Sequence, residues 1–253
     1  MVNYCQVKYN TNIMRLHRFF VHTPISSETF DIVDKDLVHQ WKNVFRYNVG
    51  SQVILFDGSG TDYLCMISSI RNLGATVQVV SKKSQPSPEA TAHRRNIWLC
   101  VALIKKDNFE LVVQKATELG VTNIVPILCE HSEKRKLNME RMQKIAVEAS
   151  EQSGRGDIPV IHEPQTISEI FESGALPQEK IIFHTDSSDT IPFKQYISST
   201  NAVSFASFIG PEGGFSDKEI ALFKSYNIPA VSLGTQILRA ETAAIAVSTL
   251  FLL

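Results

Sequence analysis

The chain has 253 residues, with 25 Lys and Arg against 26 Asp and Glu, 43% hydrophobic residues and four cysteines. This composition is typical of a globular protein and argues against disordered, fibrous and disulfide-rich classes. The formal net charge of −1 excludes a globally basic nucleic-acid binder, so any nucleic-acid site must be a local patch. The cysteines are widely spaced and form no C-x-x-C pair, which predicts reduced thiols in a cytoplasmic protein.

Both ends of the chain argue against a membrane protein. Residues 1–13 are polar and lack an apolar run, so we expect neither a signal peptide nor a membrane span but a flexible N-terminal extension. The most apolar tract, residues 243–253, is much shorter than the roughly 20 residues that a bilayer requires. It predicts a buried helix.

The next part of the chain, residues 14–85, has the pattern of a small β-rich domain. Strands are predicted at residues 53–56, 63–67 and 76–80, and one helix at residues 35–45. The stretch 81–91 contains Pro86, Pro88 and several polar residues, a composition that is typical of a linker.

Residues 92–253 alternate apolar strands with amphipathic helices, which predicts βα units around a parallel sheet, an α/β fold. The expected strands and helices are residues 97–103, 109–119, 123–128, 139–152, 181–184, 203–209, 230–233 and 240–251. Asn108 is the expected N-cap of the first helix, and Gly120 and Gly154 are the expected stops of the first two. Ser216 and Glu219 form a capping box that predicts a further helix start at Ser216.

Common catalytic motifs are absent. The sequence contains no phosphate-loop, dinucleotide-binding, zinc-protease or nucleophile-elbow pattern. Its seven histidines are scattered, so no metal site is predicted.

The concentrated signal is a pair of glycine-bearing segments after two successive strands, residues 210–214 (Gly-Pro-Glu-Gly-Gly) and residues 233–243. A glycine-rich turn at the carboxyl end of a strand lies where open parallel sheets bind ligands. A merely tight connection between strand and helix explains the glycines equally well.

These segments carry a resemblance to a known family. The motifs I-G-P-E-G-G-F-S-x-x-E at residues 209–219 and L-G-x-x-I-L-R-x-E-T-A at residues 233–243 resemble the RsmE family of small-subunit ribosomal RNA uridine-N3 methyltransferases, in the SPOUT superfamily. Residues 14–21, 115–120 and 148–155 agree with it as well.

The resemblance implies a fold, a cofactor and partners. The expected fold is an N-terminal PUA-like β-barrel and a C-terminal SPOUT-type α/β domain tied in a deep trefoil knot. The expected cofactor is S-adenosylmethionine, and the expected substrate is 16S ribosomal RNA, naked or in the assembled small subunit. A homodimer is implied, and the small apolar face formed by Ala240, Ala243, Ala244 and Val247 would permit close helix packing between copies. Burial in the chain's own core explains that face equally well.

Cofactor-binding roles follow by motif match. The expected residues are Thr185, Gly210, Pro211, Glu212, Gly213, Gly214, Leu233, Gly234, Ile237 and Leu238. The glycines would let the backbone approach adenosine, and the leucines and Ile237 would form apolar walls.

Three residues are candidates for catalysis. Glu212 could accept the uridine N3 proton, although a hydrogen-bonding role within its turn is an alternative. Arg155 and Arg239 could contact a phosphate or a base carbonyl, with surface or dimer salt bridges as the alternative.

A candidate RNA surface lies in the N-terminal domain, where cationic residues are interleaved with aromatic ones. The RNA-binding candidates are Arg15, His17, Arg18, Lys42 and Arg46, with Arg155 added from the second domain. The aromatic residues among them, Phe19, Phe20, Trp41 and Phe45, could equally be core.

One departure from the family pattern stands at residue 131. Family members usually read Glu-Arg-Ser where this chain reads Glu130-His131-Ser132. The guanidinium of arginine, which is always charged, is thus replaced by the titratable imidazole of histidine. Weaker RNA binding, with compensation by Lys134 and Arg135, is one consequence. Two other functions therefore stay open: a non-catalytic RNA-binding or ribosome-assembly module with this fold, and a methyltransferase for a different RNA.

Overall fold

The structure, a computed structural model of the whole chain, divides into two compact units, residues 1–85 and 86–253. It describes residues 16–84, 95–133, 136–185 and 190–253. The predicted N-terminal extension, Arg15, Lys134 and Arg135 lie outside the described residues.

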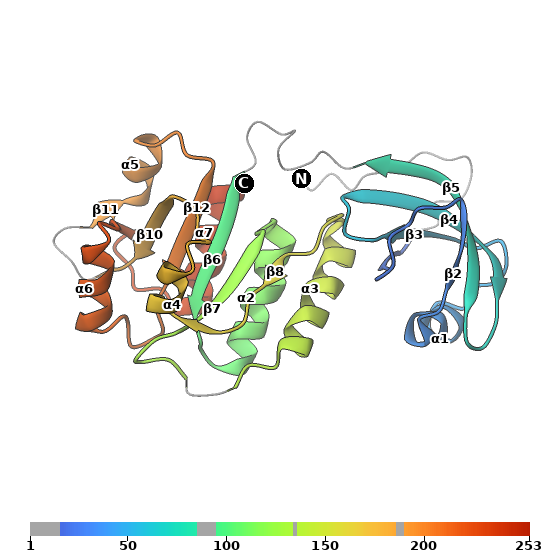
Figure 1. Cartoon of the computed structure of the whole chain (residues 1–253), viewed down its shortest axis with the longest axis horizontal. Helices are drawn as coiled ribbons and strands as arrows, with labels where there is room; N and C mark the ends of the chain where they lie inside the picture. Colours follow the sequence, from blue (N-terminus) through green and yellow to red (C-terminus); the bar gives the residue numbers. More distant parts are fainter. Residues whose placement is uncertain (1–15, 85–94, 134–135, 186–189) are drawn as a thin grey trace. The chain divides into compact units, whose positions relative to one another are not determined.

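The first unit is a five-stranded sheet with one helix (Figure 1). Its elements are β1 (Arg18–Phe20), β2 (Thr29–Ile32), α1 (Lys35–Asn43), β3 (Gln52–Phe56), β4 (Thr61–Ile70) and β5 (Ala75–Ser84). The strand order is β1-β3-β4-β5-β2; β1 runs parallel to β3, and the other neighbours are antiparallel. The three predicted strands and the predicted helix are confirmed.

The core of this unit forms between α1 and the sheet. Asp34 caps α1 by accepting hydrogen bonds from the backbone N–H groups of Asp36 and Leu37. Trp41 of α1 is fully buried, and its ring meets the edge of Phe19 at 5.6 Å between centroids. The aromatic residues next to the basic ones are therefore partly core, as the alternative interpretation held.

The second unit is built on an all-parallel sheet, which confirms the predicted α/β class. Its strands are β6 (Asn96–Ala102), β7 (Asn123–Leu128), β8 (Val160–Ile161), β9 (Gln165–Thr166), β10 (Glu179–Phe183), β11 (Ile191–Pro192), β12 (Ser204–Ile209) and β13 (Ala230–Ser232). Their order is β11-β13-β10-β12-β6-β7-β8, with β9 also paired to β7.

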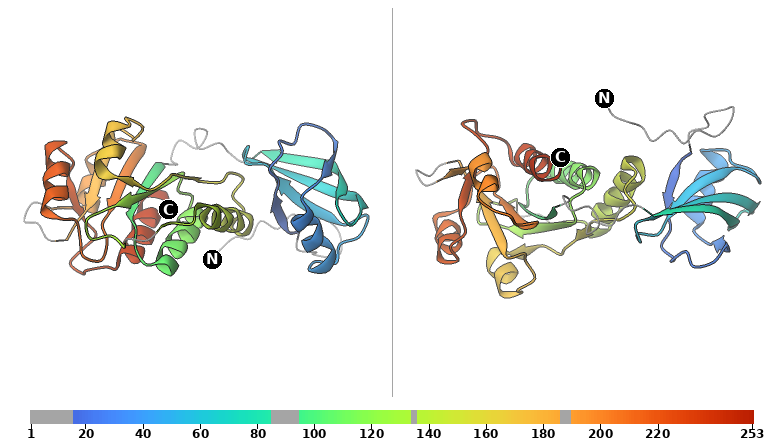
Figure 2. Two further views of the ribbon diagram at one scale, coloured as in Figure 1. Left: turned by 60° about the horizontal axis from the view of Figure 1, so that its bottom comes forward. Right: turned by 90° about the horizontal axis from the view of Figure 1, so that it is seen from above.

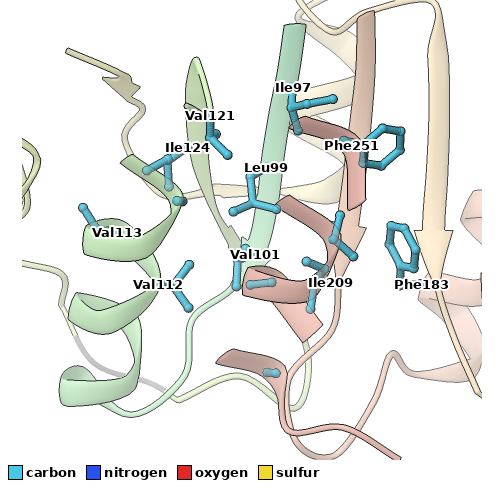
Figure 3. Close-up of a cluster of buried hydrophobic side chains, with 14 of the residues drawn as sticks. Ile97, Leu99, Val101, Val112, Val113, Val121, Ile124, Phe183, Ile209 and Phe251 are labelled. Carbon is cyan, nitrogen blue, oxygen red and sulfur yellow. The ribbon is translucent and has the colours of Figure 1, made fainter. Parts of the chain in front are cut away.

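Helices cover both faces of this sheet (Figure 2). They are α2 (Lys106–Leu119), α3 (Met139–Ser153), α4 (Ile167–Glu172), α5 (Phe193–Ser198), α6 (Asp217–Ser225) and α7 (Ala240–Leu252). Alternate residues of one strand point to opposite faces. Ile97, Leu99 and Val101 of β6 thus join the core beneath α2, α3, α5 and α7 (Figure 3), while Cys100 and Ala102 join the core beneath α4 and α6.

Helix ends follow the sequence signals with one exception. Ser216 caps α6, and its capping box with Glu219 is complete, as predicted. Gly120 and Gly154 end α2 and α3. The prediction of Asn108 as an N-cap is wrong, because α2 begins at Lys106 and the backbone N–H of Phe109 already donates to the carbonyl oxygen of Lys105 at 2.9 Å.

The C-terminal helix α7 returns to the first strand of its unit. It follows β13, which lies beyond β10, yet it packs against β6, β12 and α2. Ala240, Ala244 and Val247 are buried in the chain's own core, which is the alternative expected for this small-residue face. Among the described residues, no helix is long and apolar enough to cross a membrane.

Candidate active site

Three adjacent strands of the second unit end at one edge of the sheet. β10 lies between β12 and β13, and Phe183 at its end is in register with both Ile209 and Val231. A backbone hydrogen bond of 3.1 Å from His184 to Val231 extends this ladder. Because the strands are parallel, Thr185 and the two glycine-bearing segments leave the sheet at its carboxyl edge.

The glycine loop (residues 210–214) is a closed turn. The backbone N–H of Gly214 donates to the carbonyl oxygen of Pro211 at 2.9 Å, and Gly214 has a φ of 72°, which favours glycine. Glu212 is exposed in the middle of the turn, and its carboxylate makes no hydrogen bond to the described residues. The alternative role of Glu212, a hydrogen bond within the turn, is therefore not seen in this part of the chain.

The pocket loop (residues 233–239) forms a cavity of about 220 Å³. It is lined by Leu233, Gly234, Thr235, Gln236 and Leu238. Three of these were predicted. Thr235 and Gln236 were not, because the prediction relied on glycines and apolar side chains, and these two residues are neither. Ile237, which was also predicted, is 87% exposed and is not part of the lining.

A further loop, the β7 loop (residues 129–133), lies against the glycine loop. The Nδ1 atom of His131 is 3.1 Å from the carbonyl oxygen of Gly214. A Cβ atom placed on Gly213 would lie 3.2 Å from Cβ of His131. The departure from the family pattern at residue 131 is thus in direct contact with the predicted cofactor loop, a position that spacing along the sequence did not indicate.

Glu219 joins the same two loops through its carboxylate. Its Oε2 accepts from the backbone N–H of Ser216 at 2.7 Å, and its Oε1 accepts from that of Glu130 at 2.9 Å. Burial and the negative charge of Glu219 together raise the pKa of the Cys129 thiol to about 12. Cys129 is therefore a neutral thiol near pH 7.

The start of α7 adds two charged residues. Arg239 is exposed and is the N-cap residue of the helix. Glu241, in the first turn, is only 8% exposed, and its Oε2 has no hydrogen-bond partner among the described residues. Glu241 belongs to the family motif, but no role was predicted for it from the sequence.

Arg155 has a structural role that was not predicted. Its Nε and Nη2 donate to the two carboxylate oxygens of Asp157 at 2.9 and 2.8 Å, and its Nη1 donates to the carbonyl oxygens of Thr117 and Val121. The side chain is only 5% exposed. A guanidinium held in this way offers little surface to RNA, so these contacts replace the expected RNA-facing position with a link between α2 and the end of α3.

Two RNA-binding candidates of the first unit are likewise engaged within it. The Nη2 of Arg18 pairs with Asp62 at 2.5 Å, and its guanidinium lies 4.5 Å from the centroid of the Phe56 ring. His17 is hydrogen bonded to the hydroxyl of Tyr47 at 2.7 Å. These contacts hold both side chains within the first unit, and their role in RNA binding stays a prediction.

Two further candidates among the described residues of this unit are accessible. Arg46 is exposed, and Lys42 is partly exposed, with its ammonium 2.7 Å from the side-chain oxygen of Asn72.

Among the described residues of the whole chain, no group of three or more His, Cys, Asp or Glu is placed to hold a metal ion.

Comparison with known proteins matches both units. A family model described as an RNA methyltransferase domain matches residues 91–252, more than half of the chain, and one described as an RNA methyltransferase PUA domain matches residues 42–80. The expected PUA and methyltransferase domains are thereby confirmed.

Individual relatives agree along nearly the whole length. A Rickettsia conorii protein named ribosomal RNA small subunit methyltransferase E is 31% identical over 92% of this chain and 93% of its own length. A Bacillus subtilis protein of the same name is 28% identical over 85% of this chain and 86% of its own.

Solved structures extend the likeness to the fold. Ribosomal RNA small subunit methyltransferase E from Neisseria gonorrhoeae, bound to S-adenosyl methionine, is 26% identical with a TM-score of 0.79, over 93% of this chain and 96% of its own. A Legionella pneumophila methyltransferase in complex with this cofactor is 27% identical with a TM-score of 0.80, over 94% and 97%. This chain belongs to the RsmE family of RNA methyltransferases.

Proposed function

We propose that this protein transfers a methyl group from S-adenosylmethionine to N3 of a uridine in 16S ribosomal RNA. The observation that carries the proposal is the meeting of three strand ends at one sheet edge, where the glycine loop and the pocket loop both match the family motifs. Parallel sheets bind ligands at this edge. The names of the relatives support the small-subunit RNA as the substrate.

The residues at this edge fit S-adenosylmethionine. The 220 Å³ cavity is smaller than the roughly 300 Å³ at which small-molecule pockets begin, so it suits part of the cofactor rather than all of it. Leu233 and Leu238 would flank the adenine, and the exposed backbone of the pocket loop would hydrogen bond its polar edge. The unpartnered carboxylate oxygen of Glu241 is suited to a cationic ligand.

The chain's own groups have little covalent chemistry to perform. The bound cofactor supplies an electrophilic methyl group on a sulfonium. Transfer forms the bond from N3 to the methyl carbon and breaks the bond from sulfur to that carbon, with the electron pair going to sulfur. The N3 proton must leave, and we assign its acceptance to the exposed carboxylate of Glu212. Arg239 is assigned to a phosphate or carbonyl oxygen of the RNA.

The RNA-binding part of the proposal is centred on Lys42 and Arg46. They are the candidates of the first unit that leave cationic groups at the surface. Contacts of Lys and Arg with phosphate release counterions, so binding through them weakens as salt rises. Replacing either residue by Ala is expected to lower affinity for RNA and to reduce the dependence of that affinity on salt.

A homodimer is also proposed, on the basis of the family resemblance and of exposed aliphatic side chains at the same edge. Ile237 is 87% exposed in the pocket loop, and Leu128 is 41% exposed at the end of β7. Light scattering is expected to give twice the mass of the 28.3 kDa chain, and Ile237→Asp is expected to shift it towards the monomer.

The decisive experiment is transfer of a labelled methyl group from S-adenosylmethionine to small ribosomal subunits that lack the modification, followed by mass spectrometry of the nucleosides. Labelled 3-methyluridine is the expected product. Cofactor binding with no methylation of this RNA would indicate a different RNA substrate. Failure to bind the cofactor would favour a non-catalytic RNA-binding or ribosome-assembly module.

A further inference from the structure

The β7 loop lies beside the glycine loop and is held in place by backbone hydrogen bonds. The backbone N–H of Cys129 donates to the hydroxyl of Ser132, and the N–H of Ser132 donates back to the carbonyl oxygen of Cys129, at 3.0 and 3.1 Å. The N–H of Glu133 donates to the carbonyl oxygen of Leu103, just beyond β6, at 3.0 Å. These three hydrogen bonds fix the β7 loop internally and to the sheet.

The glycine loop, in contrast, has few side chains that could form stabilising contacts within the loop. Its own hydrogen bond joins Gly214 to Pro211. Contacts with the β7 loop support it and the helix that follows it: His131 bonds to the carbonyl oxygen of Gly214, and Glu219 bonds to the backbone of Glu130 and to the side chain of Cys129. His131 acts on the loop itself, and Glu219 acts on the first turn of α6.

We propose that His131 and Glu219 are positioning residues that hold the glycine loop in its cofactor-binding geometry. This inference rests on the proposed function, in which that loop binds S-adenosylmethionine. Neither residue is assigned a contact with the reacting atoms; each acts through the backbone of a loop that binds the cofactor.

The chemistry of His131 suits this role. A carbonyl oxygen only accepts hydrogen bonds, so Nδ1 of His131 must carry the proton that is donated to Gly214. The neutral ring with its proton on Nδ1 can make this bond, and so can the charged ring. The same side chain leaves little room on this side of the glycine loop, because a Cβ atom added to residue 213 would lie only 3.2 Å from Cβ of His131.

Glu219 is suited because its two carboxylate oxygens have separate tasks. Oε2 completes the capping box at Ser216, and Oε1 reaches the β7 loop. A glutamine at this position would retain one acceptor oxygen and therefore could not serve both N–H groups.

The test for His131 is the affinity of the full chain for S-adenosylmethionine, measured by calorimetry. His131→Ala is expected to weaken binding about fivefold, which corresponds to about 1 kcal/mol for one hydrogen bond. His131→Asn offers an N–H donor at nearly the position of Nδ1 and is expected to restore most of the affinity. Glu130→Ala is the matched control, since the neighbouring side chain is exposed and only its backbone makes the contact.

The test for Glu219 uses the second capping box of the chain. Thr166 and Glu169 form the same motif at the start of α4, and the carboxylate of Glu169 accepts only from Thr166 among the described residues. Glu169→Gln keeps an acceptor oxygen for Thr166, whereas Glu219→Gln loses one of its two N–H partners and is expected to be the less stable of the two variants. Only Glu219→Gln is expected to weaken cofactor binding, by a factor of a few.

The outcomes separate this inference from the function on which it rests. Wild-type protein that fails to bind the cofactor would overturn the proposed function. Wild-type protein that binds, together with folded His131→Ala and Glu219→Gln variants of unchanged affinity, would overturn the positioning role alone. Equal losses in His131→Asn and His131→Ala would contradict the hydrogen bond to Gly214.

Discussion

At the scale of the residue, the second unit buries the guanidinium of Arg155 and binds it by hydrogen bonds. Arg155 follows the glycine that ends α3, and its guanidinium reaches the carbonyl oxygens of Thr117, in the last turn of α2, and of Val121, just beyond it. The carbonyl oxygen of Thr117 also accepts from the backbone N–H of Gly120, whereas Val121 lies past the end of the helix, and the guanidinium supplies its carbonyl oxygen with a donor. The side chain thereby connects two helix ends.

Removal of this side chain is expected to cost stability. Arg155→Ala loses hydrogen bonds to a carboxylate and to two buried carbonyl oxygens, which should lower the free energy of unfolding by about 2 kcal/mol. Arg155→Lys keeps the charge but not the fork and should lose less. Urea unfolding measures both. A variant that unfolds like the wild type yet no longer methylates RNA would instead place the guanidinium in catalysis.

Burial of His162 predicts a pH dependence of stability. The ring packs 4.9 Å from Trp98 between centroids, and desolvation lowers its pKa below the usual range. The unfolded chain therefore takes up the proton first as pH falls below about 6.5, and the stabilisation present above that pH is lost down to the folded pKa.

The measurement compares urea unfolding at pH 7.5 and at pH 5.5. The loss of stability between the two is expected to be smaller in His162→Gln than in the wild type, because the variant has no ring to titrate. The same loss in both proteins would show that His162 does not contribute.

Crowding at Gly213 predicts a loss of cofactor binding on substitution. The backbone of this residue is not in the left-handed region, so a side chain here would add bulk without backbone strain. Gly213→Val would press against Cβ of His131 and displace the loop, so affinity for S-adenosylmethionine should fall severalfold. Lys218→Ala, on the exposed start of α6, is the control, and equal affinities in both variants would contradict the assignment of the loop.

At the scale of the element, the sequence was most informative where an element is long or ends in a specific chemical signal. Strand β7 was predicted with its observed bounds, and the capping box placed the start of α6. The two-residue strands β8, β9 and β11 and the six-residue helices α4 and α5 were missed. Such short segments have too few residues to show a period, and the sheet or core on which they pack determines them.

The two capping boxes give a prediction at this scale. Ser216→Ala and Thr166→Ala each remove a side-chain acceptor for the backbone N–H of the third helical residue. Each should lower the free energy of unfolding by about 1 kcal/mol. Thermal unfolding of the two variants and the wild type measures it, and an unchanged midpoint for either variant would contradict the role of that cap.

At the scale of the whole molecule, the site combines segments that are distant in the sequence. The parallel strands at residues 97–103 and 203–209 could be predicted from the sequence, and so could the meeting of their carboxyl ends at one edge of the sheet. The contact between His131 and Gly214 could not, because it depends on the strand order that places β6 between β7 and β12. The intramolecular partners of Arg155 and Arg18 could not be predicted either, because the first depend on the packing of α2 and α3 and the second on the strand order of the first unit. A deep trefoil knot stays a prediction from the family resemblance.

Separation of the two units gives the last prediction. Residues 86–253 contain their own core and the whole candidate cofactor site, so this fragment is expected to fold and to bind S-adenosylmethionine with nearly the affinity of the full chain. Its methylation of small subunits should fall at least tenfold, because Lys42 and Arg46 are absent. The methyl-transfer assay tests both statements. Full activity of the fragment would show that the first unit is dispensable for substrate binding.

The return of α7 to β6 has a consequence for biosynthesis. The pocket loop immediately precedes α7, and α7 covers the strand with which the second unit begins. During translation, α7 leaves the ribosome after every element that it covers, so the core around β6 cannot close until residues 240–252 have been made. A chain that stops before α7 would leave the apolar side chains of β6 and α2 uncovered, and such exposed surfaces favour aggregation.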